Sequence, residues 1–379
     1  MHLDELLRGL FEQNGSDLYL TADSAPLFRV DGSTVPALPV TLEAGQVEAL
    51  IREALRPHDL EEFDRTNELN TARAVAGTGR FRLNVFRQRG AMGLVARLIR
   101  TDLPSNESLA LPEILPRLVM SKRGLILITG ATGSGKSTTL AALVDHRNVN
   151  SRGHILTIED PIEFVHPHKG CVVTQREVGV DTESFAAGLK SALRQAPDVI
   201  LIGEMRDVET VEAAIHFAET GHLVLGTLHA NNANQAVEGV MNFFGPESHA
   251  QLYAQLALNL RGIVSQRLIP KASGPGRAAA IEIMINTPRV ADLIAKGEIA
   301  ALKDSIEANT ADGSQSFDQA LFELYRKREI TLDEALKQAD SANNLRLKIK
   351  MQEAGERAAT LAGSSATANP FALKKEEEI

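Results

Sequence analysis

The sequence predicts an α/β protein in which a parallel sheet, covered by helices on both faces, follows a smaller α/β domain. From about residue 119, short apolar segments alternate with helical ones, as in sheets whose strands are joined by helical crossovers. A glycine-rich loop separates the first of these apolar segments from a helix. A proline-containing stretch divides this region from the first 100 residues, which follow a different pattern.

Residues 1–100 are the first predicted domain. Apolar residues recur at helical spacing at the start and again in residues 46–55. Strands fit residues 17–20, 27–30, 80–87 and 93–99. All basic side chains in this domain are arginines, and from Leu69 to Arg100 there are seven arginines and no acidic residue. This acid-free run is a candidate for contact with an anionic group.

The second domain is predicted to occupy residues 119–284, after a linker at residues 101–118 that contains three prolines. Its strands fit residues 125–129, 155–158, 199–202 and 223–227, and its helices fit residues 138–149, 184–194 and 207–220. Residues 285–345 are predicted to form a C-terminal helical region. Residues 346–379 are rich in alanine, serine, threonine and charged side chains, a composition that predicts a disordered tail.

Composition narrows the class of protein. The 379 residues include 40 basic and 49 acidic side chains, a net charge of −9, which argues against a general nucleic-acid binder. A single cysteine excludes an intramolecular disulfide framework and a cysteine-cluster zinc site. No secretory signal and no apolar run near the ~18 residues of a membrane span is present. We therefore expect a cytoplasmic protein with no direct membrane insertion.

The glycine-rich loop predicts a phosphate site. Residues 130–137, Gly-Ala-Thr-Gly-Ser-Gly-Lys-Ser, match the pattern G-x-x-x-x-G-K-[ST], between a buried strand and a helix. Backbone N–H groups of such a loop surround a phosphate chain, and the helix directs its positive end at it. We expect Lys136 to reach the β- and γ-phosphates of ATP and Ser137 to hold Mg²⁺. The residues expected to contact the nucleotide are Gly130, Thr132, Gly133, Ser134, Gly135, Lys136, Ser137 and Thr138.

Carboxylates follow two further strands. Residues 159–163, Glu-Asp-Pro-Ile-Glu, come after the second strand of this domain, and Glu204 follows an isolated apolar strand. The carboxyl ends of parallel strands face one crevice, so these acids should meet the phosphate loop. There they can orient Mg²⁺ and the attacking water. For Asp160 and Asp198, helix caps or surface positions are an equally simple interpretation.

His229 follows the strand at residues 223–227 and should reach the same edge of the sheet. A histidine there can hydrogen-bond the γ-phosphate and report its loss. A structural histidine is the simpler alternative, because most histidines near a core have no catalytic role.

With these features in place, the chain resembles the PilT/PilU-type retraction ATPases of type IV pili, in the bacterial secretion ATPase superfamily. The resemblance covers residues 1–345, and four boxes in family order and spacing carry it. These are the phosphate loop at 130–138, the Asp box at 157–164, the Walker B segment at 198–207 and the His box at 221–229.

The resemblance implies a PAS-like N-terminal domain, a RecA-like ATPase domain and a homo-hexameric ring. It implies Glu163 as the water-activating carboxylate, Glu204 as the Walker B glutamate and His229 as γ-phosphate sensor, with Ser137, Glu163 and Glu204 around Mg²⁺. The family's N-domain arginines match Arg80, Arg82 and Arg97. We expect Arg82 and Arg97 to complete a neighbouring subunit's site, although arginines on a strand face can also be simply solvated.

Departures from PilT favour an accessory, PilU-like motor. Residues 289–296 read Arg-Val-Ala-Asp-Leu-Ile-Ala-Lys, without the two arginines of PilT's Ala-Ile-Arg-Asn-Leu-Ile-Arg-Glu segment. The expected partners are a PilT-like paralogue and the pilus platform protein, which would hold the motor peripherally at the inner membrane.

The alternative function is a ring-shaped nucleic-acid translocase or helicase, because RecA-like rings also do that work. The acidic charge, the absence of tryptophan and an aromatic content of 4% leave few platforms for stacking bases. We therefore expect no nucleic-acid partner.

Overall fold

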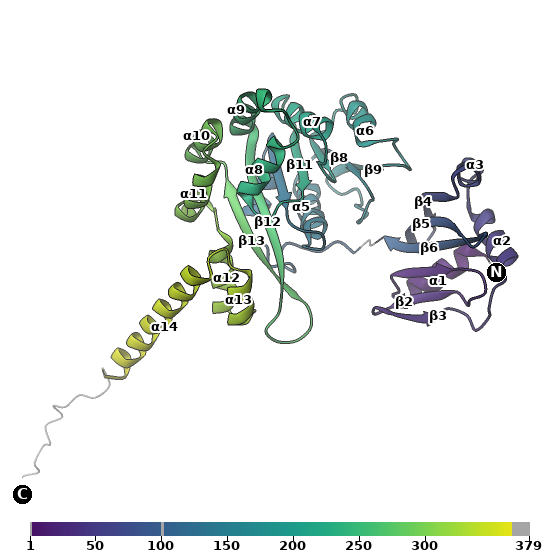
Figure 1. The fold of residues 1–379 in the computed structure, drawn as a ribbon, viewed down its shortest axis with the longest axis horizontal. Helices are drawn as coiled ribbons and strands as arrows, with labels where there is room; N and C mark the ends of the chain where they lie inside the picture. The colour runs from purple at the N-terminus through teal and green to yellow at the C-terminus, as the bar shows by residue number, and fades with distance from the viewer. Residues whose placement is uncertain (1, 100–101, 366–379) are drawn as a thin grey trace, which may run out of the picture.

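The computed structural model describes residues 2–99 and 102–365 and confirms the predicted α/β fold class, with two sheets that follow one another along the chain (Figure 1). The first six-stranded sheet has the order β3-β2-β1-β6-β5-β4, and all neighbours are antiparallel. Its elements are α1 (Leu3–Glu12), β1 (Asp17–Leu20), β2 (Leu27–Val30), β3 (Ser33–Pro36), α2 (Ala44–Ala54), α3 (Pro57–Thr66), β4 (Glu68–Val75), β5 (Gly79–Gln88) and β6 (Ala91–Ile99).

The two-residue period of β5 separates the two faces of this sheet. Phe81, Leu83 and Val85 are buried in one cluster with apolar residues of α1, α2 and α3. Arg80 and Arg82 lie at the alternate positions of the strand and point to the other face. The sequence therefore places the arginines on the side of the sheet that the three helices leave uncovered.

The second sheet has seven strands in the order β13-β12-β7-β11-β10-β8-β9. Neighbours from β12 to β9 are parallel, and β13 is antiparallel to β12. Its elements are α4 (Ile114–Val119), β7 (Gly124–Thr129), α5 (Lys136–Asn150), β8 (Gly153–Glu159), β9 (Cys171–Glu177), α6 (Phe185–Ala192), β10 (Val199–Ile202), α7 (Val208–Glu219), β11 (Leu223–Leu228), α8 (Ala233–Met241), η1 (Pro246–Ser248), α9 (His249–Asn259), β12 (Leu260–Pro270) and β13 (Arg277–Ile285).

The central strand β7 is buried on both faces, which explains its continuous apolar sequence. Leu125 and Leu127 join the cluster that includes α6 to α9, whereas Ile126 and Ile128 join the cluster of α4 and α5. This double cover fixes the end of β7, and with it the start of the phosphate loop.

The C-terminal region is helical. Its last three α-helices pack on the β12–β13 pair through a separate apolar cluster, whereas its first two α-helices join the cluster of α6 to α9. It comprises α10 (Pro288–Lys296), η2 (Ile299–Ala301), α11 (Leu302–Ala308), η3 (Thr310–Asp312), α12 (Phe317–Arg326), α13 (Leu332–Gln338) and α14 (Ala342–Ser365). In Figure 1, α14 projects away from the rest of the chain. No helix within the described ranges is both long and apolar enough to cross a membrane.

The structure differs from the predicted tail over residues 346–365, which continue α14 instead of being disordered. Their alanine, lysine, methionine and glutamine are strong helix formers, and the composition that indicated disorder equally favours a helix. Leu345 and Ile349, four positions apart, anchor its first turns in the C-terminal cluster. Residues 366–379 of the predicted tail lie outside the described residues.

Candidate nucleotide-binding and hydrolysis site

The phosphate loop joins β7 to α5, and its shape depends on two glycines with positive φ. Gly130 has φ +149° and Gly135 has φ +90°, values at which a side chain is rarely tolerated. A Cβ would come within 2.6 Å of the Gln266 carbonyl oxygen at Gly130 and within 2.7 Å of Gln266 Nε2 at Gly135. The loop therefore curls tightly against β12, with the N-terminus of α5 facing its interior. Ser134 Oγ is buried and has no hydrogen-bond partner among the described residues, as expected of a group that faces a ligand.

Lys136 is the first residue of α5 and folds back over the loop. Its Nζ donates to the carbonyl oxygens of Gly130 at 2.7 Å and Ala131 at 3.1 Å. Burial lowers the pKa of Lys136, while the nearby carboxylates of Glu204 and Glu163 oppose the shift. The lysine thus places its ammonium between the loop and the two carboxylates.

Glu163 and Glu204 come from neighbouring parallel strands, as the sequence predicts. Glu204 follows β10, Glu163 follows β8, and the two strands are paired in register. Both carboxylates line one cavity of about 440 Å³ together with Lys136 and Ser137. This cavity is large enough for the phosphates and part of a nucleoside.

His229, after β11, lies against one of these carboxylates. Its Nε2 is 2.8 Å from Glu204 Oε1. Arg206 is 3.9 Å from the other oxygen of Glu204 and 3.0 Å from Asp160 Oδ2. The polar residues predicted to follow β8, β10 and β11 therefore form one cluster at the edge of the sheet.

Glu159, the last residue of β8, is a buried member of this cluster that sequence reasoning left without a role. Thr157 Oγ1 donates to its carboxyl at 2.6 Å, and Gln175 Nε2 donates at 3.2 Å. Burial raises the pKa of Glu159 to about 7, against these hydrogen bonds. Glu159 fixes the start of the segment that carries Asp160 and Glu163.

Sequence reasoning also missed Arg277, the first residue of β13. Its Nη1 is 3.5 Å from the Gly133 carbonyl oxygen, and its side chain lines the cavity with Leu268 of β12. The β12–β13 pair escaped prediction because Arg, Ser and Gln interrupt its apolar run. The apolar run of β13, interrupted by Glu282, was a signal that could have indicated this strand.

Comparison with known proteins identifies the family. The model for "Type II/IV secretion system protein" matches residues 105–301. The type IV pilus ATPase PilU of Pseudomonas aeruginosa is 51% identical over 351 residues, which cover 93% of this chain and 92% of PilU. The chain is a PilT/PilU-type ATPase of the type II/IV secretion family.

Further relatives agree with this PilT/PilU assignment. The pilus retraction ATPase PilT of Pseudomonas aeruginosa is 43% identical over 91% of this chain and all of PilT. A crystal structure of the retraction motor PilT with bound ADP superposes with a TM-score of 0.83 at 38% identity, covering 90% of this chain and 98% of that one. The chain is therefore an ATP hydrolase with an N-terminal domain and a RecA-like ATPase domain.

The N-domain arginines of this PilT/PilU-type chain stand apart from its own cavity. Arg82 and Arg97 are directly opposite on β5 and β6, and neither lines the cavity. Arg97 Nε is 2.8 Å from the buried Asp17, and its side chain stays 68% exposed. Arg80 lies 3.5 Å from Asp181 of the ATPase domain. The structure thus brings together the predicted site residues of the ATPase domain but not the predicted arginines.

Proposed function

We propose that this chain is a subunit of a homo-hexameric motor that hydrolyses ATP to power type IV pilus retraction, as an accessory PilU-like motor beside a PilT-like paralogue. The polar cluster of Lys136, Glu163, Glu204 and His229 in one cavity is the observation that carries the proposal. The similarity to PilU along nearly the whole chain supports the mechanical role. No observation on the described residues favours the nucleic-acid alternative.

The geometry of the cluster supports a separate role in hydrolysis for each of its residues. The loop N–H groups and Lys136 bind the phosphates, because the loop is shaped by glycines and Lys136 sits within it. Glu163 activates the attacking water, and Glu204 orients it. His229 senses the γ-phosphate, since its contact with Glu204 ties its position to the occupancy of the site.

The donor set around Lys136 fits Mg²⁺ bound with a nucleotide. No group of three or more His, Cys, Asp or Glu side chains within the described ranges is arranged to hold a metal by itself. Ser137, Glu163 and Glu204 offer hard oxygen donors, and Mg²⁺ commonly takes its remaining ligands from phosphates and water. When bound, the ion would neutralise charge on the phosphates.

We further propose that Arg82 and Arg97 complete the active site of a neighbouring subunit. Like charges directly opposite on paired strands are destabilising, and both arginines occupy the face that the N-domain helices leave uncovered. A phosphoryl group in transfer needs a cation, which arginine fingers supply in other nucleotide hydrolases.

The accessory role rests on α10. Its apolar residues Val290 and Leu293 are buried, so the exposed face is polar. On that face Asp292 pairs with Arg289 at 3.4 Å and Lys296 at 2.8 Å. Asp292 therefore engages both cations of α10, and the helix contains one arginine, so it lacks the pair of arginines that PilT has in this segment.

Pilus retraction in cells tests the proposal. We expect deletion of this chain to weaken retraction while the PilT-like paralogue is present, and wild-type protein but not Lys136→Ala to restore it. With the paralogue deleted, this chain alone should give little retraction. Strong retraction by this chain alone would contradict the accessory role, and unchanged retraction after its deletion would contradict the motor function.

A further inference from the structure

Three consecutive residues of β12 connect the nucleotide site with the C-terminal helices. Ser265 Oγ accepts a hydrogen bond of 2.9 Å from Thr129, the last residue of β7. Gln266 Oε1 accepts one of 2.7 Å from Thr139, in the first turn of α5. Arg267, the next residue, contacts the C-terminal helical region. β12 therefore contacts a residue before the phosphate loop, a residue after it, and the C-terminal region.

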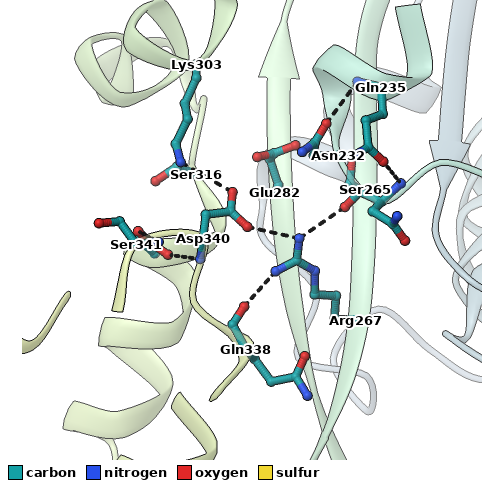
Figure 2. A network of polar contacts seen from close by, with 12 residues as sticks. Asn232, Gln235, Ser265, Arg267, Glu282, Lys303, Ser316, Gln338, Asp340 and Ser341 are labelled. Atoms are coloured by element: carbon teal, nitrogen blue, oxygen red, sulfur yellow. Dashed lines mark hydrogen bonds and ion pairs between the residues drawn. The ribbon is translucent and has the colours of Figure 1, made fainter. Parts of the chain in front are cut away.

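Arg267 joins three segments that are distant in sequence (Figure 2). Its Nη1 donates to the Gln338 carbonyl oxygen at 2.6 Å, and its Nη2 lies 3.0 Å from Asp340 Oδ1. The same Nη2 donates to the Asn231 carbonyl oxygen at 3.3 Å. The Phe317 ring of α12 lies 3.8 Å from the guanidinium carbon. One side chain thus holds the loop after β11 against the C-terminal helices.

The loop that Arg267 holds is the one that carries His229. His229 contacts Glu204, and four residues later Ala233 donates its backbone N–H to the buried Glu282 at 2.7 Å. The loop is therefore fixed at both ends. The hydrogen bond from Arg267 to the Asn231 carbonyl oxygen links the middle of this loop to the C-terminal helices.

Asp340 fixes Arg267 from the other side. Its second oxygen is 3.5 Å from Lys303 of α11, and its backbone N–H donates to Asp318 of α12 at 2.8 Å. The side chains of Arg267 and Asp340 are 23% and 15% exposed, so water screens their attraction only partly. Removing Asp340 would leave the partly buried Arg267 without this carboxylate, and removing Arg267 would leave Asp340 with only the longer contact to Lys303, so either loss is costly.

We propose that Arg267 is a positioning residue for His229, and that the Arg267–Asp340 pair transmits the arrangement of the C-terminal helices to the γ-phosphate sensor. The proposal rests on the sensor role of His229 given under Proposed function. A shift of Asp340 or Gln338 moves the guanidinium, and the guanidinium carries the Asn231 carbonyl with it. The phosphate loop is tied to β12 through Ser265 and Gln266, so nucleotide binding does not depend on this contact.

The test is steady-state ATP hydrolysis and equilibrium nucleotide binding by the full-length chain carrying Arg267→Gln. We expect kcat to fall about tenfold and the dissociation constant for a non-hydrolysable ATP analogue to stay within about threefold. The matched control is Arg326→Gln, because the ion pair of Arg326 is with Glu323 of its own helix, and this change should leave kcat unchanged.

A double-mutant cycle with His229 separates positioning from general stability. If Arg267 acts through His229, Arg267→Gln should change kcat less than about twofold in a His229→Ala protein. Equal loss of kcat in both backgrounds, a loss of nucleotide binding, or an unchanged kcat for Arg267→Gln would overturn the proposal. A His229→Ala protein with wild-type kcat would instead overturn the sensor role itself.

Asp340→Asn keeps the test decisive if Arg267→Gln does not fold. The amide preserves the shape of Asp340 and one hydrogen bond to Arg267, so the expected fall in kcat is smaller, about threefold. It should also disappear in the His229→Ala background. A fall in kcat that persists there, or none in either background, would again overturn the proposal.

Discussion

The carboxyl edge of the ATPase sheet and the arginine face of the N-terminal sheet present their charges in different ways. At the ATPase edge, polar side chains are held by contacts within one cavity: Lys136 donates to loop carbonyls, and His229 lies against Glu204. On the N-terminal sheet, Arg82 and Arg97 face each other across paired strands, and Arg97 stays largely exposed although its Nε contacts Asp17. The first region is preorganised within one chain, whereas the second has the features of a surface that awaits a partner.

This difference indicates where each kind of variant should act. Changes at the ATPase edge should disable the chain that carries them. Changes on the arginine face should disable its neighbour, if the ring assembles as proposed.

Lys136→Ala should abolish ATP hydrolysis and weaken nucleotide binding, because it removes the cation held inside the phosphate loop. Steady-state hydrolysis and titration with a fluorescent ATP analogue measure the two effects. Lys122→Ala is the matched control, since Lys122 is exposed and precedes β7. Normal turnover by Lys136→Ala would contradict the whole assignment of the ATPase edge.

The double variant Arg82→Ala/Arg97→Ala should lower kcat by about 10³, within the range of an arginine finger. Mixed in equal amounts with Lys136→Ala under subunit exchange, it should recover up to about a quarter of wild-type activity. Random assembly places an intact lysine beside intact arginines at about that share of interfaces. Arg89→Ala, in the exposed turn between β5 and β6, is the control.

Two results would contradict completion by a neighbour. The first is no recovery of activity in mixtures whose subunits demonstrably exchange. The second is full activity of the double variant alone, which would show that the cation comes from elsewhere, with Arg277 and Arg206 of the chain's own site as the candidates.

Some residues of the ATPase edge were predictable from the sequence, and others were not. The strands of the ATPase sheet that carry Glu163, Glu204 and His229 are short and buried on both faces, so their apolar runs are continuous and their ends are evident. The cavity residue Arg277 was not predictable in this way, because β13 reaches the site through its hairpin with β12, and a long-range pairing of β12 with β7 brings that hairpin beside the phosphate loop. Local patterns do not encode such pairings.

The arginine face shows a second limit of sequence reasoning. The period of β5 places Arg80 and Arg82 on one face, but it does not reveal that β6 pairs Arg97 opposite Arg82. Nor does it separate Arg80, which contacts Asp181 of the ATPase domain, from its neighbours. These assignments needed strand register and domain contacts.

Glu204→Gln and Glu163→Gln should each lower kcat by about 10² to 10³ while leaving ATP binding near the wild-type value. Both carboxylates serve the transition state more than the ground state, so their loss appears in kcat. Single-turnover hydrolysis and equilibrium binding measure the two quantities, with Glu209→Gln on the exposed start of α7 as control. A loss of affinity with unchanged kcat would assign these carboxylates to binding instead.

The smallest expected effect concerns the free energy of unfolding. It tests whether the carboxyl of Glu282, in the ATPase domain, is buried enough to titrate differently in the folded chain. Burial raises the pKa of Glu282 to about 7, with Asp340 adding to the shift and Arg267 and the hydrogen bonds from Ala233 and Ser265 opposing it.

Because the folded-state pKa lies above the ordinary value of 4.5, the folded chain holds a proton that the unfolded chain releases between about pH 4.5 and 7. The contribution of Glu282 to stability is therefore complete below about pH 4.5 and is lost as the pH rises through about 7. Glu282→Gln keeps an oxygen that accepts from Ala233 but cannot ionise, so it should stabilise the chain at pH 8 by on the order of 1–2 kcal/mol relative to pH 5. Unfolding midpoints at both pH values measure this difference, with the exposed Glu307→Gln as control. An equal effect of Glu282→Gln at pH 5 and pH 8 would show that this carboxyl does not titrate differently in the folded chain, and the contrast between a buried ATPase domain and an exposed arginine face would lose that support.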